Sequence, residues 1–220
     1  IPIEIAFQDF KRALDGDKGP NTGGMGSYGP VPFVDKEMIY DITNRMINPV
    51  VQKMKESGNP FIGFLYYGMI NTEDGPKVIE INVRLGHPEA LPLMMMLNCS
   101  LDETIRSALN GKINSANLDY KKGGAFCTML ASKGYPEKGE EGLEITGLDE
   151  IDDKNVKVFY DKTRRDGTKI LTGNGRIIGV TAYSKKGVLS ARKLSSSYSR
   201  KLNIPGEFHY RRDMGDRVLI

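Results

Sequence analysis

Long apolar runs are missing from this 220-residue sequence. The longest candidates, residues 61–70 and 90–97, have the length of a strand or a buried helix, whereas a membrane-spanning helix needs about 20 apolar residues. With 39% hydrophobic and 27% charged residues, the composition is that of a globular protein. We therefore expect one substantial core or two small ones, and no membrane partner.

Cysteine and histidine are also scarce, with two residues of each. Cys99 and Cys127 lie in apolar surroundings without C-x-x-C spacing, which favours reduced core thiols in a cytoplasmic protein over a disulfide or a zinc site. His87 and His209 have no cysteine or histidine at zinc-ligand spacing. No serine lies in a nucleophile-elbow pattern, which argues against a serine hydrolase.

Concentrated charge is missing too, because the net charge of +3 is spread along the whole chain. No RNA-recognition, zinc-finger or homeodomain pattern accompanies the basic residues, so we expect no nucleic-acid partner. Four separated basic pairs are predicted to be solvated surface: Lys185-Lys186, Arg192-Lys193, Arg200-Lys201 and Arg211-Arg212.

The first sixty residues alternate between extended and helical patterns. Residues 1–6 carry neither a basic leader nor a small-residue cleavage site, so we predict a strand from a longer sequence and no targeting peptide. Residues 15–30 are too rich in glycine and proline for a regular element and are predicted to form a long structured loop. A helix is predicted from an Asp35 cap to Gly58, with a kink or break at Pro49.

The next segment has hairpin and helix signals. Residues 61–70 and 77–85 are strand-like runs separated by a turn-rich hexapeptide, so we predict an antiparallel hairpin. Pro88 opens a helical segment that continues to Leu97. Ser100 begins a capping box for a further helix.

Beyond residue 118 the pattern changes to short strands, which places a domain boundary there. Strands are predicted at 125–131, 156–160 and 176–183, and a helix at 188–202. The predicted domains are therefore residues 1–117 and 118–220.

The second hairpin strand has the most informative pattern. Glu80, Asn82 and Arg84 alternate with apolar residues, and side chains two apart share one face of a strand. Mg²⁺ prefers oxygen ligands and shares one or two protein oxygens with substrate phosphates, so Glu80 and Asn82 can hold a nucleotide-bound ion. Arg84 can meet phosphate charge. The alternative is an ordinary solvent-facing strand of an antiparallel sheet.

The glycine-rich segment 16–29 suggests a second site, because glycines let backbone N–H groups approach an anion closely. It matches neither the P-loop nor the dinucleotide fingerprint, and a plain surface loop is the alternative. Asn21 and Thr22 offer polar contacts within it. Four charged residues can bind an anionic substrate or pair among themselves: Asp9, Lys11, Arg12 and Asp17.

These segments resemble the glycinamide ribonucleotide synthetase (phosphoribosylamine–glycine ligase) family. The resemblance rests on QDFKR at 8–12, DKGPNTGGMG at 17–26, GFLY at 63–66, VIEINVRLG at 78–86 with Pro88-Glu89 after it, and YRRDMG at 210–215. It implies an α+β fold, in which part of an ATP-grasp domain with an antiparallel sheet precedes a small antiparallel sheet-plus-helix C-terminal domain.

The resemblance also implies an ATP-dependent carbon–nitrogen ligase of purine biosynthesis. ATP would phosphorylate the glycine carboxylate, and the amine of phosphoribosylamine would attack the glycyl phosphate to give glycinamide ribonucleotide, ADP and phosphate. Such chemistry needs charge neutralisation and alignment more than a proton-transfer residue.

The resemblance implies roles for particular residues. Glu80 and Asn82 match the nucleotide and metal ligands, for Mg²⁺ or Mn²⁺, and Arg84 is the catalytic candidate. The implied substrate-binding residues are Lys11, Arg12, Asp17, Asn21, Thr22, Gly23, Gly24, Pro88 and Glu89.

Two residues depart from the family pattern, which commonly has aspartate at position 87 and histidine at position 10. His87 and Phe10 replace them here. The family's N-terminal domain and ATP-grasp lid segment have no counterpart in the sequence, so we expect little or no ligase activity from the chain alone. The alternatives are another ATP-grasp carboxylate–amine ligase, against which the glycine-rich motif argues, and a non-catalytic module descended from such an enzyme.

Overall fold

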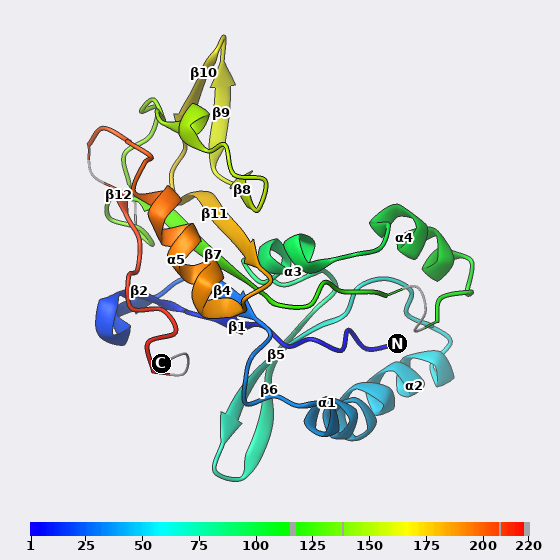
Figure 1. Ribbon diagram of the computed structural model, residues 1–220. Helices are drawn as coiled ribbons and strands as arrows, with labels where there is room; N and C mark the ends of the chain where they lie inside the picture. Colours follow the sequence, from blue (N-terminus) through cyan, green and yellow to red (C-terminus); the bar gives the residue numbers. More distant parts are fainter. Residues whose placement is uncertain (115–117, 138, 207, 218–220) are drawn as a thin grey trace. The chain divides into compact units, whose positions relative to one another are not determined.

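The computed structural model describes residues 1–114, 118–137, 139–206 and 208–217 (Figure 1). Two compact units interleave along the chain. Unit 1 comprises Ile1–Ala6, Val31–Gly86 and Leu97–Tyr120, and unit 2 comprises Phe7–Pro30, His87–Met96 and Lys121–Ile220. The linear division at residue 118 stays a prediction.

The helical part of unit 1 begins as the sequence predicts. Helix α1 (Lys36–Ile42) is capped by Asp35, whose carboxylate accepts a hydrogen bond from the Met38 N–H at 2.8 Å. A π-helical turn (Thr43–Ile47) then leads into α2 (Asn48–Glu56). The backbone stays helical from Lys36 to Glu56, so the predicted kink or break takes the form of this π-helical turn. It precedes Pro49, which lacks an N–H for the helical ladder but is tolerated in the first turn of α2.

The predicted hairpin of unit 1 is also confirmed. Strand β5 (Tyr66–Thr72) pairs antiparallel with β6 (Gly75–Asn82) around a two-residue turn. The register shifts between Gly68 and Met69, which face Glu80 and Val78, so Ile79 is the extra residue of a bulge. Helix α4 (Leu101–Leu109) follows Ser100, whose hydroxyl caps it as predicted.

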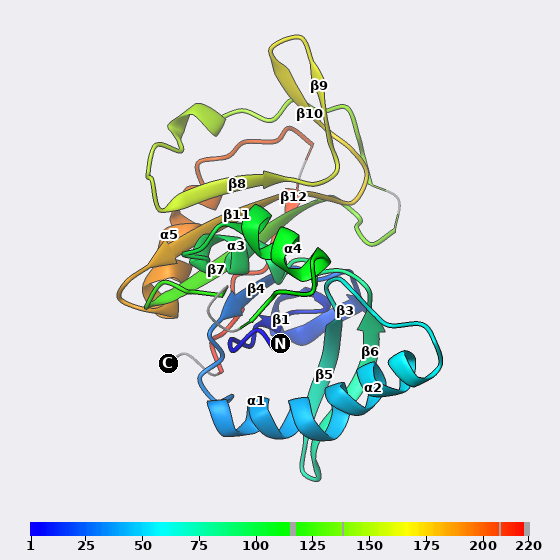
Figure 2. The same cartoon turned by 90° about the vertical axis from the view of Figure 1, so that its right-hand side faces the viewer.

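Unit 2 is built on an antiparallel six-stranded sheet in the order β1-β4-β7-β11-β8, with β12 beside β7. Its central strand, β7 (Gly124–Ser132), is buried at every residue. Figure 2 shows β8 beside β11 along the sheet. The remaining strands are β1 (Gln8–Asp9), β4 (Gly26–Gly29), β8 (Val156–Tyr160), β11 (Arg176–Ser184) and β12 (Phe208–His209).

Two helices pack on this sheet, α3 (Ala90–Met96) and α5 (Val188–Ser199). Leu91 of α3 packs against Cys127 and Met129 of β7, whereas the intervening Thr128 meets Ser195 of α5 at 2.8 Å. Because successive strand residues point to opposite faces, the two helices cover opposite faces of the sheet. The α5 prediction, at 188–202, is three residues too long.

Two predictions about the N-terminal segments are wrong. Residues 1–6 form no strand, and the predicted loop 15–30 contains β4 and also β3 (Lys18–Asn21), which pairs with β2 (Arg12–Leu14). A short 3-10 turn (Asp15–Asp17) joins β2 to β3. Gly16 in the turn and Gly19 in β3 take left-handed backbone angles, with φ 71° and 76°, which glycine adopts without steric cost. Asp17, between them, also has a positive φ, of 54°.

A two-stranded hairpin that was not predicted is formed by β9 (Thr163–Asp166) and β10 (Lys169–Thr172). The predicted α+β class with antiparallel sheets is confirmed. None of the helices in the described ranges combines the length and apolarity that a bilayer crossing requires.

Candidate functional site

The first group of predicted site residues lies on β6 in unit 1. Glu80 faces Gly68 across the β5–β6 ladder, and a Cβ built on Gly68 would lie 2.7 Å from Cγ of Glu80. Gly68 does not have a left-handed backbone. Glycine is therefore needed at position 68 because a side chain there would clash with Glu80, and not because of the backbone angles.

Asn82 is the second member of this group. Its side-chain amide nitrogen is buried and makes no hydrogen bond to the part of the chain that the structure describes. Buried amides normally have partners, and the oxygen and nitrogen of an amide are exchanged by a simple flip. Glu80 and Asn82 thus offer two oxygens two positions apart on one strand, a donor set that fits Mg²⁺ sharing its shell with water and phosphate.

A metal site built from protein ligands alone has no support. Among the described residues, no three His, Cys, Asp or Glu side chains gather closely enough to hold an ion. Arg84 lies two residues beyond the end of β6, is exposed, and donates to the carbonyl of Leu85 at 2.8 Å. The regular strand that was predicted to align it with Glu80 and Asn82 therefore ends before Arg84.

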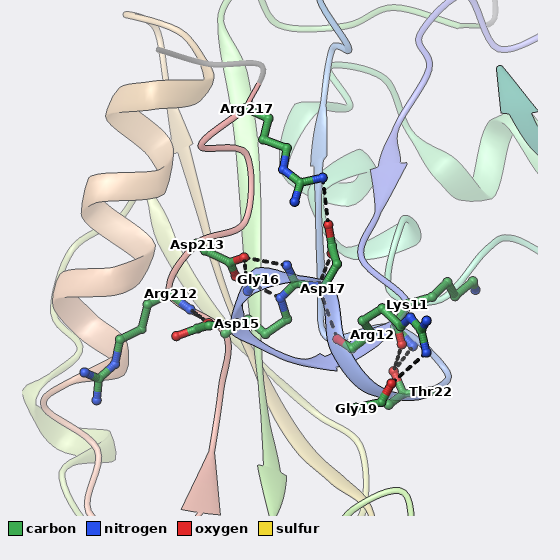
Figure 3. Close-up of polar contacts among 12 residues, drawn as sticks. Lys11, Arg12, Asp15, Gly16, Asp17, Gly19, Thr22, Arg212, Asp213 and Arg217 are labelled. Carbon is green, nitrogen blue, oxygen red and sulfur yellow. Dashed lines mark hydrogen bonds and ion pairs between the residues drawn. The ribbon is translucent and has the colours of Figure 1, made fainter. Parts of the chain in front are cut away.

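The second group lies in the glycine-rich segment of unit 2, where polar side chains hold the local fold (Figure 3). Arg12 of β2 donates to the carbonyl of Gly19 at 2.7 Å. The Thr22 hydroxyl donates to the carbonyl of Lys11 at 2.8 Å and accepts from the Gly24 N–H at 3.0 Å. Asn21 faces Arg12 across the β2–β3 ladder. The substrate contacts of these residues stay predictions.

An ion-pair network fastens the turn before β3 to the C-terminal segment. Nη1 of Arg211 lies 2.8 Å from Oδ1 of Asp17, and Nη2 lies 2.8 Å from Oδ2 of Asp213. Asp213 also accepts the Gly16 N–H at 2.8 Å (Figure 3). The Arg211 side chain is only 2% exposed and its guanidinium lies 5.4 Å from the ring centre of Phe10.

This network corrects one prediction and explains one departure. The Arg211-Arg212 pair was predicted to be solvated surface, which is wrong for Arg211 and right for Arg212. Burial raises the pKa of Asp213, but hydrogen bonds from Arg211 and Gly16 outweigh burial and hold that pKa at about 2. Phe10, a predicted departure from the family pattern, gives Arg211 an aromatic face.

A buried carboxylate cluster lies at the other end of the glycine-rich segment. The Asp9 side chain is 8% exposed, its Oδ2 lies 2.6 Å from Nζ of Lys11, and Glu89 is also buried. Burial and the nearby Glu89 carboxylate raise the pKa of Asp9 to about 7, against the opposing effect of Lys11. A Cβ built on Gly24 would lie 2.5 Å from both Oδ1 of Asp9 and Cδ of Pro88.

Four of the predicted substrate-binding residues therefore come together in unit 2: Lys11, Gly24, Pro88 and Glu89. Asp9 joins them; the sequence analysis placed it among four charged residues that can bind an anionic substrate or pair among themselves. Asp9 lies on β1, which pairs with β4, and it packs beside Gly24.

Comparisons with known proteins show the family of the chain. The phosphoribosylglycinamide synthetase ATP-grasp (A) domain matches residues 2–90, and the C domain of the same family matches residues 125–217. The phosphoribosylamine–glycine ligase of Rhodopirellula baltica is 41% identical over 216 residues, covering 97% of this chain and 49% of that protein. The chloroplastic ligase of Arabidopsis thaliana is 43% identical over 225 residues, covering 100% and 42%.

Solved structures show the same similarity. The crystal structure of phosphoribosylamine–glycine ligase from Thermotoga maritima matches with a TM-score of 0.82 and 29% identity, over 94% of this chain and 50% of that one. The biotin carboxylase domain of a 2-oxoglutarate carboxylase matches with a TM-score of 0.59 and 15% identity, over 84% and 41%, which shows the fold alone. The chain spans about half the length of the ligases it matches.

The raised pKa of Asp9 predicts a pH-dependent stability. The folded state binds the Asp9 proton more tightly than the unfolded state, so the free energy of unfolding should fall as the pH rises from about 4 to about 7. Asp9 contributes at most about 1.4 kcal/mol per pH unit to this slope. In urea unfolding of the 220-residue chain at several pH values, the free energy of unfolding should fall less with rising pH in Asp9→Asn than in the wild type. The same pH dependence in both proteins would contradict a raised pKa for Asp9.

The Arg211 network predicts a large stability difference between neighbouring arginines. Arg211→Met removes the buried partner of the Asp17 and Asp213 carboxylates and should lower the free energy of unfolding by about 1.5–3 kcal/mol. Arg212→Met, at an exposed position, should change it by less than about 0.5 kcal/mol. Equal losses in the two variants, measured by urea unfolding, would show that Arg211 has no special role.

Proposed function

Because this chain belongs to the phosphoribosylglycinamide synthetase family, we propose that it carries the C-terminal part of an ATP-dependent ligase that joins glycine to 5-phosphoribosylamine. The products are glycinamide ribonucleotide, ADP and phosphate, and the step belongs to purine biosynthesis. The observation that carries the proposal is the pair of Glu80 and Asn82 on β6, with Gly68 opposite Glu80 and an unsatisfied buried amide on Asn82.

Unit 1 supplies the nucleotide and metal ligands in this proposal. Glu80 and Asn82 hold the divalent ion, Mg²⁺ or Mn²⁺, which when bound neutralises charge on the transferring phosphoryl group. Arg84 is exposed beyond the strand end, and its guanidinium adds positive charge for the phosphates. A carboxylate and an amide on one strand orient the nucleotide through the ion without a proton transfer, which suits a reaction that depends on alignment.

Unit 2 supplies residues for the amino acid and the amine. Two buried carboxylates, Asp9 and Glu89, lie close enough for the charge of Glu89 to raise the pKa of Asp9, and the Lys11 ammonium lies beside Asp9. A cluster of buried acids attracts the amino group of a substrate, which can bind it through charge-assisted hydrogen bonds. We assign glycine and phosphoribosylamine to the surroundings of Gly24, Pro88 and Glu89 on this ground.

A second enzymatic function has less support. ATP-grasp carboxylases share the fold at 15% identity, whereas the phosphoribosylamine–glycine ligases are 36–43% identical over nearly the whole chain. The cytoplasmic location is part of the proposal and rests on the two unpaired thiols.

The test is a chimera in which this chain replaces the matching half of the Rhodopirellula baltica ligase. We expect the folded chimera to release phosphate from ATP only when glycine and phosphoribosylamine are both present, and the isolated chain to release none. Glu80→Ala should lower turnover at least about 100-fold, because one of the two metal-binding oxygens is lost. Glu73→Ala, in the exposed hairpin turn, is the control. A folded chimera that lacks this activity would refute the proposal and favour a non-catalytic module.

Gly68→Ala separates metal binding from folding. The new methyl group must displace the flexible Glu80 side chain and not the backbone, so the chain should stay folded. Moving one metal ligand should raise the Mg²⁺ concentration for half-maximal turnover of the chimera by roughly 10–100-fold. Asn71→Ala, on the same hairpin and exposed, should leave it unchanged. A normal Mg²⁺ requirement in Gly68→Ala would mean that Glu80 does not bind the ion in this position.

A further inference from the structure

Arg176 gathers backbone carbonyls from two turns that lie far apart in the sequence. Its Nη1 donates to the carbonyl of Gly23, and lies 3.3 Å from those of both Gly24 and His87. Its Nε lies 3.5 Å from Oδ2 of Asp161. The Arg176 side chain is 17% exposed, so these interactions are largely shielded from water.

The packing around this guanidinium is close. A Cβ built on Gly23 would lie 3.0 Å from Cζ of Arg176, so any side chain at position 23 would push the guanidinium away. The Gly23 N–H is also held, because it donates to the Tyr135 hydroxyl at 3.0 Å. The peptide groups on both sides of Gly23 are therefore bound by side chains from distant parts of unit 2.

Carbonyl oxygens of separate turns carry like partial charges and repel one another when they converge. The Arg176 guanidinium offsets this repulsion through Nη1, while Nε, fixed in the same plane, approaches Asp161. A lysine ammonium is a single point charge on a flexible stem and has no second nitrogen to approach Asp161. Arg176 thus has the chemistry to hold both turns in one relative position.

Asp161 explains how His87 is accommodated. Nε2 of His87 lies 3.7 Å from Oδ2 of Asp161, the same oxygen that Nε of Arg176 approaches. An aspartate at position 87 would place a second carboxylate beside Asp161. The imidazole avoids that repulsion.

We infer that Arg176 is a positioning residue for substrate binding: it sets the glycine-rich turn at Gly23-Gly24 against the turn that carries Pro88 and Glu89. The inference rests on the proposed function, which assigns glycine and phosphoribosylamine to the surroundings of Gly24, Pro88 and Glu89. Arg176 itself touches the turns and acts through them.

The first test needs only the 220-residue chain. Amide hydrogen exchange of Arg176→Met and Arg176→Lys should accelerate at Gly23, Gly24 and Glu89, with the amides of β7 and β11 unchanged. Arg165→Met, at an exposed position of β9, is the matched control and should exchange as the wild type does. Unchanged exchange at the two turns, or an equal increase throughout the sheet, would overturn the positioning role.

The second test uses the chimera. Arg176→Lys and Arg176→Met should raise KM for glycine or phosphoribosylamine about 10- to 100-fold, because displaced turns misplace the substrates. The KM for ATP and the Mg²⁺ requirement, which belong to unit 1 in the proposed function, should not change. Wild-type KM values in both variants would overturn the inference. If the unsubstituted chimera is inactive, the proposed function fails, while the exchange experiment still decides whether Arg176 positions the turns.

Discussion

The pairing of β4 with β7 is the constraint on which the rest of unit 2 depends. Every residue of β7 is buried, and one of its edges pairs with β11 along almost its whole length. Its other edge is shared end to end, with β4 beside residues 125–128 and β12 beside residues 131–132. The glycine-rich segment and the C-terminal segment therefore lie close together because each contributes a strand to the same edge of β7.

Two buried or largely buried arginines complete that arrangement. Arg211 follows β12 by two residues, which brings its guanidinium to Asp17 at the turn before β3. Arg176, the first residue of β11, reaches the other side of the same segment at Gly23 and Gly24. A segment with many glycines loses much conformational entropy on folding, and charge-assisted hydrogen bonds at both ends offset part of that loss. The glycine-rich segment is thus ordered by distant residues and not by its own composition.

Unit 1 presents a different situation, since its hairpin exposes apolar residues. Ile79 is 66% exposed and Val83 is 76% exposed, although both belong to the alternating pattern that was predicted to make one apolar face. The bulge at Ile79 changes the alternation locally, and the strand ends at Asn82. What the hairpin does position is Glu80, because Gly68 leaves room for its side chain on the opposite strand.

The sequence by itself determined the elements whose causes are local. The Asp35 and Ser100 caps, the interruption of the α-helix before Pro49 and the β5–β6 hairpin follow from side chains within a few residues of each feature. The predicted pair Glu80 and Asn82 follows from the period of a strand. The signature motifs likewise pointed to the family. Only the tertiary structure decided that residues 15–30 contain strands, that Asp9 is a buried acid with a raised pKa, and that Arg211 is buried. These features depend on partners up to 199 positions away, such as the carbonyl of Arg12 for Arg211, and local periodicity carries no information about contacts of that range.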